Sequence, residues 1–130
     1  EALGALPLEV YLARDMMVLL KDEDTVASLK PDFGKIAAID EGLGIIVTAK
    51  GSTSDFVSRC FYPKMGVNED PVTGSAHSNL IPYWSEKLNK STMKALQLSE
   101  RKGVLYCELS KDRVNISGTG VLYMTGEINT

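Results

Sequence analysis

The sequence has few of the residues on which specialised classes of protein depend. Its 130 residues include two cysteines and one histidine. Cys60 and Cys107 lie far apart, without Cys-x-x-Cys spacing and without a Cys/His cluster, so no zinc site or other metal centre is expected. Two free thiols are typical of a reducing compartment, and we therefore expect a cytoplasmic location.

Long runs of one charge and long apolar runs are also missing. The 14 basic and 17 acidic residues give a formal net charge of -3, and the only basic doublet is Arg101-Lys102. A nucleic-acid partner is not expected, because there is no basic patch to contact phosphates. The longest apolar stretch near the N-terminus, residues 16–20, is far shorter than the roughly twenty residues that span a bilayer. A membrane partner is not expected either.

The composition that remains is that of an ordinary globular protein. With 44% hydrophobic and 24% charged residues, the chain can build a core, and its length predicts one domain over residues 1–130. Patterning predicts seven or eight strands, over residues 9–14, 16–20, 45–49, 56–62, 93–98, 104–109, 114–117 and 121–128. Short helices are expected at 24–29 and 31–35, with Asp24 or Thr25 as a cap. Gly118 and Gly120 predict a bulge or bend.

One longer helix is predicted over residues 74–89. Its apolar stripe consists of Ala76, Leu80, Tyr83, Trp84 and Leu88. Pro82 lies inside it, where a kink is expected because proline removes a helical hydrogen bond. A helix with this much apolar surface needs a sheet curled around it, so the predicted fold class is α+β.

The segment EDPVTGSAH, residues 69–77, comes directly before and into this helix. Pro71 should hold Asp70 in an extended conformation, and Thr73 is a candidate N-cap. Gly74 lets another molecule approach the backbone closely, and the first N–H groups of the helix with the Ser75 hydroxyl form a good receptor for an anion. From the pattern alone, a well-capped helix without a ligand is the simpler interpretation, and both interpretations stay open.

Two other side chains are candidates for the same site. His77 falls in the first or second helical turn and could reach the pocket, although an isolated histidine is more often structural. Arg59 could bind an anion or pair with Asp70 or Glu69, and the ion pair is favoured. Both cysteines fall in strand-like segments, where inert buried thiols are typical.

A longer segment resembles a known family. Residues 55–90, DFVSRCFYPKMGVNEDPVTGSAHSNLIPYWSEKLNK, resemble the C-terminal half of the PhzF-like (phenazine biosynthesis-like) isomerases. ARDMMVLLKDEDTVASLKPDF upstream, and LQLSERKGVLYCEL and DRVNISGTGVLYMTGEI downstream, are similar to the same half. The resemblance implies a diaminopimelate epimerase-like fold, with two lobes that each wrap a strongly curved mixed sheet around a central helix. This chain then corresponds to one lobe.

The resemblance also implies an activity: isomerisation or epimerisation of a small carboxylate-bearing metabolite by proton transfer, without metal or organic cofactor. Asp70 then lies in the active site, where it orients the substrate or assists proton transfer, Gly74 and Ser75 hold the substrate carboxylate, and Thr73 has a positioning role. His77 is an expected substrate contact from its place in the helix alone. The family's main acid/base is a glutamate of the N-terminal half, which has no counterpart in these residues. No cysteine stands in the DPVTGSA stretch, which argues against the two-thiol mechanism of related epimerases.

Three hypotheses follow for the chain as a molecule. It is one lobe of a two-lobed isomerase, inactive without the N-terminal lobe as its partner. Alternatively it is a stand-alone module that binds small anions or dimerises without catalysis. A third option is a homodimer in which two copies of Asp70 face each other as an acid/base pair, with one pKa raised by repulsion.

Overall fold

An eight-stranded sheet forms the framework of the protein in the computed structural model, which describes residues 1–128. The strands are β1 (Glu9–Leu12), β2 (Met16–Leu19), β3 (Ile45–Lys50), β4 (Phe56–Tyr62), β5 (Val67–Asp70), β6 (Thr92–Gln97), β7 (Gly103–Ser110) and β8 (Arg113–Ser117). Their order is β1-β2-β3-β4-β6-β7-β8, and β5 also pairs with β4. The β2–β3 and β4–β6 pairs are parallel and the others antiparallel, so the sheet is mixed.

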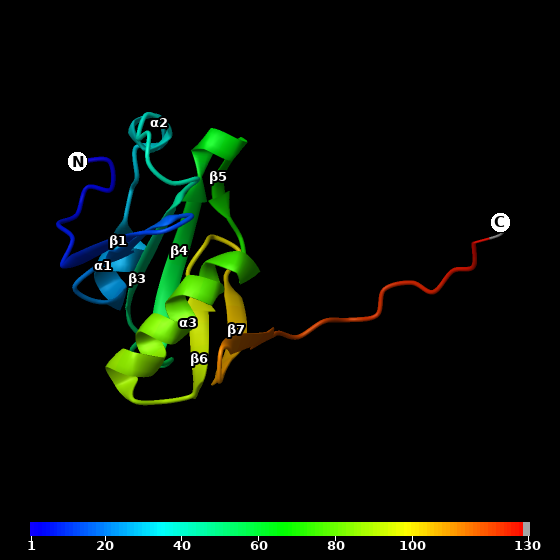
Figure 1. Cartoon of the computed structure of the whole chain (residues 1–130). Helices are drawn as coiled ribbons and strands as arrows, with labels where there is room; N and C mark the ends of the chain where they lie inside the picture. Colours follow the sequence, from blue (N-terminus) through cyan, green and yellow to red (C-terminus); the bar gives the residue numbers. More distant parts are fainter. Residues whose placement is uncertain (129–130) are drawn as a thin grey trace.

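The two faces of the sheet carry separate cores. Along β4, Phe56, Cys60 and Tyr62 pack on the face that α3 (Gly74–Leu88) covers, while Val57 and Phe61 pack on the opposite face. That opposite face is covered by α1 (Glu23–Ser28) and α2 (Phe33–Ala37). Because β4 is buried on both faces, it lacks a polar side. The α+β class and the curved mixed sheet around one long helix are confirmed, with two short helices on the outer face (Figure 1).

Trp84 fixes α3 to the sheet. Its ring stacks on Phe56 with centroids 5.7 Å apart, and its Nε1 donates to the Thr48 hydroxyl at 2.9 Å. Thr48 in turn donates to the carbonyl of Val57 at 2.7 Å. The helix continues through Pro82. Its C-cap is Asn89, whose left-handed backbone (φ 52°) stops the helical hydrogen-bond pattern. No helix in the described part of the chain is long and apolar enough to cross a membrane.

The caps of the short helices differ from the sequence expectation. Asp22, not Asp24 or Thr25, caps α1, and its Oδ1 accepts the N–H of Thr25 at 2.8 Å. Asp32 caps α2 in the same way through the N–H of Lys35. The second helix therefore starts two residues later than expected, because an aspartate that can accept this bond stands at residue 32.

One edge of β4 is shared by two strands. β6 pairs with Phe56–Ser58, and β5 pairs with Cys60–Tyr62 after a register irregularity. A 3-10 turn, η1 (Pro63–Met65), links β4 to β5. The chain runs from β5 straight into α3, so the start of α3 lies next to this fork between β5 and β6 (Figure 1).

The expected strand over residues 121–128 is wrong. Residues 118–128 form no strand, and no bulge occurs at Gly118 or Gly120; the segment extends away from the body (Figure 1). Val121, Leu122 and Tyr123 are 94%, 83% and 97% exposed. The sequence has the right pattern for a strand, but a strand also needs a neighbouring strand to accept and donate its backbone hydrogen bonds.

Candidate active site

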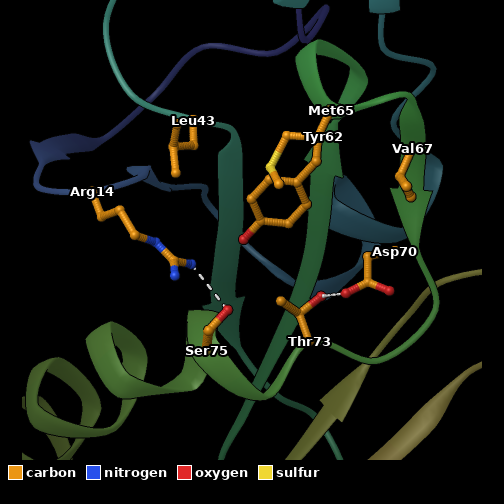
Figure 2. Close-up of a pocket in the computed structure, with 8 residues that line it drawn as sticks. All are labelled: Arg14, Leu43, Tyr62, Met65, Val67, Asp70, Thr73 and Ser75. Carbon is orange, nitrogen blue, oxygen red and sulfur yellow. Dashed lines mark hydrogen bonds between the residues drawn. The ribbon is translucent and has the colours of Figure 1, made fainter.

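A pocket of about 330 Å³ opens beside the start of α3. The residues that line it are Arg14, Leu43, Tyr62, Met65, Val67, Asp70, Thr73 and Ser75, drawn in Figure 2. They come from the β1–β2 turn, the segment before β3, the end of β4, η1, β5, and the N-cap and first turn of α3. Of the five residues expected at the site, the structure brings Asp70, Thr73 and Ser75 to the pocket wall, with Gly74 between them in the chain.

Asp70 and Thr73 contact each other directly. Asp70 is the last residue of β5, and its Oδ2 accepts a hydrogen bond from the Thr73 hydroxyl at 2.6 Å (Figure 2). Thr73 stands at the N-cap position with an extended backbone, but its side chain makes no capping hydrogen bond. The N-cap position expected for Thr73 is confirmed, but its hydroxyl donates to the Asp70 carboxylate and accepts no helical N–H.

The first turn of α3 is open to an incoming group. Gly74 and Ser75 are exposed, and a Cβ built on Gly74 would meet no atom within 4 Å. The first N–H groups of a helix have no partner within the helix, and the positive end of its dipole lies there. Since no side chain within residues 1–128 caps this end, its N–H groups are free to bind a carboxylate or phosphate.

Arg14 is the charged pocket residue that sequence reasoning missed. Its Nη2 donates to the Ser75 hydroxyl at 2.9 Å and to Asp15 Oδ2 at 2.7 Å. The hydrogen bond and charge of Asp15 raise the pKa of the Arg14 guanidinium. Among the described residues, the N–H groups of Nη1 have no recorded partner, so they are available to an anion. Arg14 and Ser75 are 61 positions apart in the sequence, so no local pattern signals this contact.

The rest of the pocket is an apolar wall. Leu43, Met65 and Val67 are 46%, 64% and 44% exposed, so large apolar side chains surround the polar groups at the helix start. Burial raises the pKa of the Tyr62 hydroxyl, which stays neutral, and this hydroxyl lies 3.5 Å from Asp15 Oδ2. Apolar walls with a few converging polar groups are typical of small-molecule sites.

His77 does not line the pocket, contrary to the expectation that it contacts substrate. It is fully buried, with its ring centroid 5.9 Å from that of Phe56. Its Nδ1 lies 2.7 Å from the carbonyl oxygen of Thr73, four residues back along the helix. Burial lowers the pKa of the imidazole. The helix turns this side chain toward the sheet, because residues 73, 76, 77 and 80 share its buried face.

Arg59 has a structural partner, and the favoured ion pair is confirmed. Its Nε and Nη2 donate to the two carboxylate oxygens of Glu69 at 2.7 and 2.8 Å. Its Nη1 donates to the carbonyls of Val26 and Leu29 at the end of α1. Both charges are largely buried, with side chains 11% and 19% exposed. Arg59 therefore holds β5, and with it Asp70, against α1.

The two thiols are inert. Cys60 and Cys107 are buried and free, and burial raises the pKa of Cys60 to about 12 and that of Cys107 to about 11. A thiol protonated at neutral pH is a poor nucleophile and a poor base. Within residues 1–128, no group of three or more His, Cys, Asp or Glu side chains could hold a metal ion.

Comparison with known proteins gives a consistent answer. The family model described as "Phenazine biosynthesis-like protein" matches residues 1–126. An uncharacterized isomerase from Pseudomonas aeruginosa is 50% identical over 129 residues, which cover 98% of this chain and 49% of that protein. Mouse phenazine biosynthesis-like domain-containing protein 2 is 44% identical over 117 residues, covering 82% of this chain and 41% of that protein.

Solved structures agree with the sequence comparison. A PhzF family protein from Enterococcus faecalis is 56% identical with a TM-score of 0.90, covering 91% of this chain and 45% of that chain. A putative PhzC/PhzF protein from Clostridium difficile is 51% identical with a TM-score of 0.88, covering 98% and 49%. The chain spans about half the length of the relatives it matches. The chain belongs to the phenazine biosynthesis-like (PhzF-like) protein family, several of whose members are named isomerases.

Proposed function

We propose that this chain is the C-terminal lobe of a two-lobed isomerase that moves a proton on a small carboxylate-bearing metabolite without a cofactor. The observation that carries the proposal is one pocket that combines the uncapped start of α3, the Ser75 hydroxyl, the Arg14 guanidinium and the Asp70 carboxylate. The coverage of about half of each relative supports the two-lobed assembly.

The proposed division of labour follows from charge. The N–H groups at Gly74 and Ser75, with Arg14, attract and orient the substrate carboxylate. Asp70 then lies beside the bound anion, where it orients the substrate or shuttles a proton. The partner lobe supplies the main base, because among the pocket-lining residues Asp70 is the one carboxylate. The isolated lobe should therefore bind a carboxylate but not turn it over.

A second candidate function is a module that binds anions or dimerises without catalysis. The exposed apolar wall formed by Leu43, Met65 and Val67 favours a covering partner, and a second copy of this chain would serve. In such a homodimer, two copies of Asp70 would face each other as an acid/base pair. Sedimentation tests the homodimer: a monomer at about 10 µM rules it out, whereas a dimer would support it.

The carboxylate receptor is tested by NMR titration of this chain with benzoate, with benzamide as the uncharged control of the same shape. Benzoate should shift the amide resonances of Gly74 and Ser75, and benzamide should not. Ser75→Ala should weaken benzoate binding roughly ten- to a hundred-fold, the effect of one lost hydrogen bond to a charged group. Arg14→Gln should weaken it as well.

The matched control is Ser78→Ala, which removes an exposed hydroxyl from the same helix one turn away. Ser78→Ala should bind benzoate like the native chain. Equal affinities for Ser75→Ala and Ser78→Ala would remove the receptor assignment. In the complete two-lobed enzyme, Ser75→Ala should lower kcat/KM with the fold intact, and unchanged kinetic constants would contradict the proposal there.

A further inference from the structure

Gln97 is a fully buried amide at the fork between β5 and β6, outside the set of pocket-lining residues. It is the last residue of β6. Its Oε1 accepts the backbone N–H of Thr73 at 2.8 Å, and its Nε2 donates to the carbonyl of Asp70 at 2.7 Å and to the Thr73 hydroxyl at 3.1 Å. All three hydrogen bonds go to one four-residue loop, residues 70–73.

The chemistry of these partners determines which way the amide points. A backbone N–H can only donate and a backbone carbonyl can only accept. Rotating the amide by 180° would bring two donors together at Thr73 and two acceptors together at Asp70. The Nε2 group must therefore face the Asp70 carbonyl, and the neighbouring Thr73 hydroxyl receives its second N–H.

The direction of the next hydrogen bond follows from this one. Because the Thr73 oxygen accepts from Gln97, its single proton is directed elsewhere, and Asp70 Oδ2 lies 2.6 Å away. The buried Cys60 thiol does not compete as an anionic acceptor, because burial raises its pKa to about 12 and it stays protonated. In the described part of the chain, the hydrogen bond recorded for the Asp70 carboxylate is at Oδ2.

We propose that Gln97 is a positioning residue for the pocket: through the Thr73 hydroxyl it holds the Asp70 carboxylate in one orientation and leaves Oδ1 for a ligand. The relevance of this positioning to catalysis rests on the proposed function, in which Asp70 orients the substrate or shuttles a proton. The relay from Gln97 to Thr73 to Asp70 is a property of this chain by itself. It is therefore testable without substrate or partner lobe.

The test uses isosteric variants of the 130-residue chain and two NMR signals, the side-chain carboxyl ¹³C resonance of Asp70 and the exchange rate of the Thr73 amide. Gln97→Glu is compared above the pH at which the introduced carboxyl ionises, followed by its own ¹³C resonance, because burial raises the pKa of such a group. The ionised side chain still accepts the Thr73 N–H but attracts the Thr73 hydroxyl proton away from Asp70. The Asp70 resonance should then move, while Thr73 amide exchange stays within about three-fold of native. Gln97→Met removes every hydrogen bond at similar size, so the Asp70 resonance should move and the amide should exchange at least about ten-fold faster.

A double-mutant cycle tests the relay itself. Thr73→Val, which lacks the hydroxyl, should move the Asp70 resonance, and adding Gln97→Glu should move it no further. The carboxyl of Asp22, at the cap of α1, is the internal reference and should not move. The uncharged Gln97→Met variant keeps the test available if the buried charge of Gln97→Glu prevents folding.

Two outcomes would overturn the proposal. An Asp70 resonance that stays in place in a folded Gln97 variant would mean that Gln97 only joins β6 to the loop. An equal movement on the Thr73→Val background would mean that Gln97 acts by another route. Neither readout involves carboxylate binding, so failure here is separable from failure of the benzoate titration.

Discussion

At the scale of single residues, burial decides which titratable side chains can take part in chemistry. Cys60, Cys107 and His77 are buried. Burial raises the pKa of the two thiols and lowers the pKa of the imidazole, which favours the neutral form of all three side chains. Asp70 and Arg14 lie at the pocket and keep access to an incoming ligand. The groups left for charge chemistry are therefore one carboxylate and one guanidinium, which suits anion binding beside an acid.

His77 gives the stability of the protein a pH dependence. Its pKa in the folded chain is below the ordinary value of 6.5, because burial disfavours the imidazolium. Below pH 6.5 the unfolded chain binds a proton that the folded chain does not, so stability falls as pH falls. Between pH 7.5 and about 5.5, we expect the free energy of unfolding to decrease by up to roughly 1.4 kcal/mol per pH unit at the steepest point.

Urea unfolding at a series of pH values checks this, and His77 is the only histidine in the chain. The matched variant His77→Gln is neutral throughout and can still donate to the carbonyl of Thr73. Its stability should vary much less over the same pH range. An identical slope in both proteins would assign the pH dependence to other groups.

At the scale of elements, the contact between α3 and the sheet sets where the pocket stands. The Trp84 indole, the Thr48 hydroxyl and the Val57 carbonyl form a buried chain of hydrogen bonds from helix to β3 to β4. Arg59 holds β5 from the other face through Glu69. The start of α3 and the end of β5 are thus fixed against the same sheet, which places Ser75 and Asp70 in one pocket.

Thr48→Val tests this anchor, since it replaces the hydroxyl by a methyl group of similar size. Two buried polar groups, Trp84 Nε1 and the Val57 carbonyl, each lose one hydrogen-bond partner. We expect the free energy of unfolding to fall by about 1–3 kcal/mol. Urea unfolding followed by the fluorescence of Trp84, the only tryptophan, measures it.

The control is Thr48→Ser, which keeps the hydroxyl and loses the methyl group. It should be less destabilised than Thr48→Val, because a missing buried methyl costs about 1 kcal/mol without leaving a polar group unpaired. A valine variant as stable as the serine variant would show that the hydrogen bonds add little to the anchor.

At the scale of the whole molecule, two exposed apolar regions stand out. One is the pocket wall of Leu43, Met65 and Val67, and the other is the C-terminal segment around Leu122 and Tyr123. Large exposed apolar regions mark interaction surfaces in soluble proteins. In the proposed two-lobed protein, these surfaces are the ones that the other lobe would cover.

The C-terminal segment should contribute little to the stability of this chain. Because residues 121–124 are at least 76% exposed, ending the chain after Ser117 should change the free energy of unfolding by no more than about 0.5 kcal/mol. Chemical denaturation of the two proteins measures the difference. Ending the chain after Asp112 is the contrasting control, since it removes β8 and the packing of Val114 and Ile116.

That control should be destabilised by several kcal/mol, because a strand paired with β7 and two partly buried side chains that pack on the core are lost. Equal losses in the two truncated chains would mean that the C-terminal segment packs against this lobe in solution. Full stability after removal of β8 would contradict the sheet order described above.

The sequence by itself determined the elements whose signals are local. The alternation and apolar runs of residues 45–49 and 56–62 predicted β3 and β4, and the stripe from Ala76 to Leu88 predicted α3 with its buried face. The EDPVTGSAH segment predicted the turn and the start of α3, because turn, cap and helix chemistry depend on neighbouring residues, but the pattern alone left a plain helix cap and an anion site both open. Local patterns also predicted a strand at 121–128, where no neighbour exists to pair with it.

Only the tertiary structure decided which residues meet. Arg14 reaches Ser75 across 61 residues, and Gln97 reaches Thr73 across 24, because the sheet order brings the β1–β2 turn and the end of β6 to the start of α3. The tertiary structure also placed the His77 side chain in the core, because the helix face that carries it packs against the sheet. Strand order and helix orientation depend on burying both faces of the sheet at once, and that requirement belongs to the whole chain.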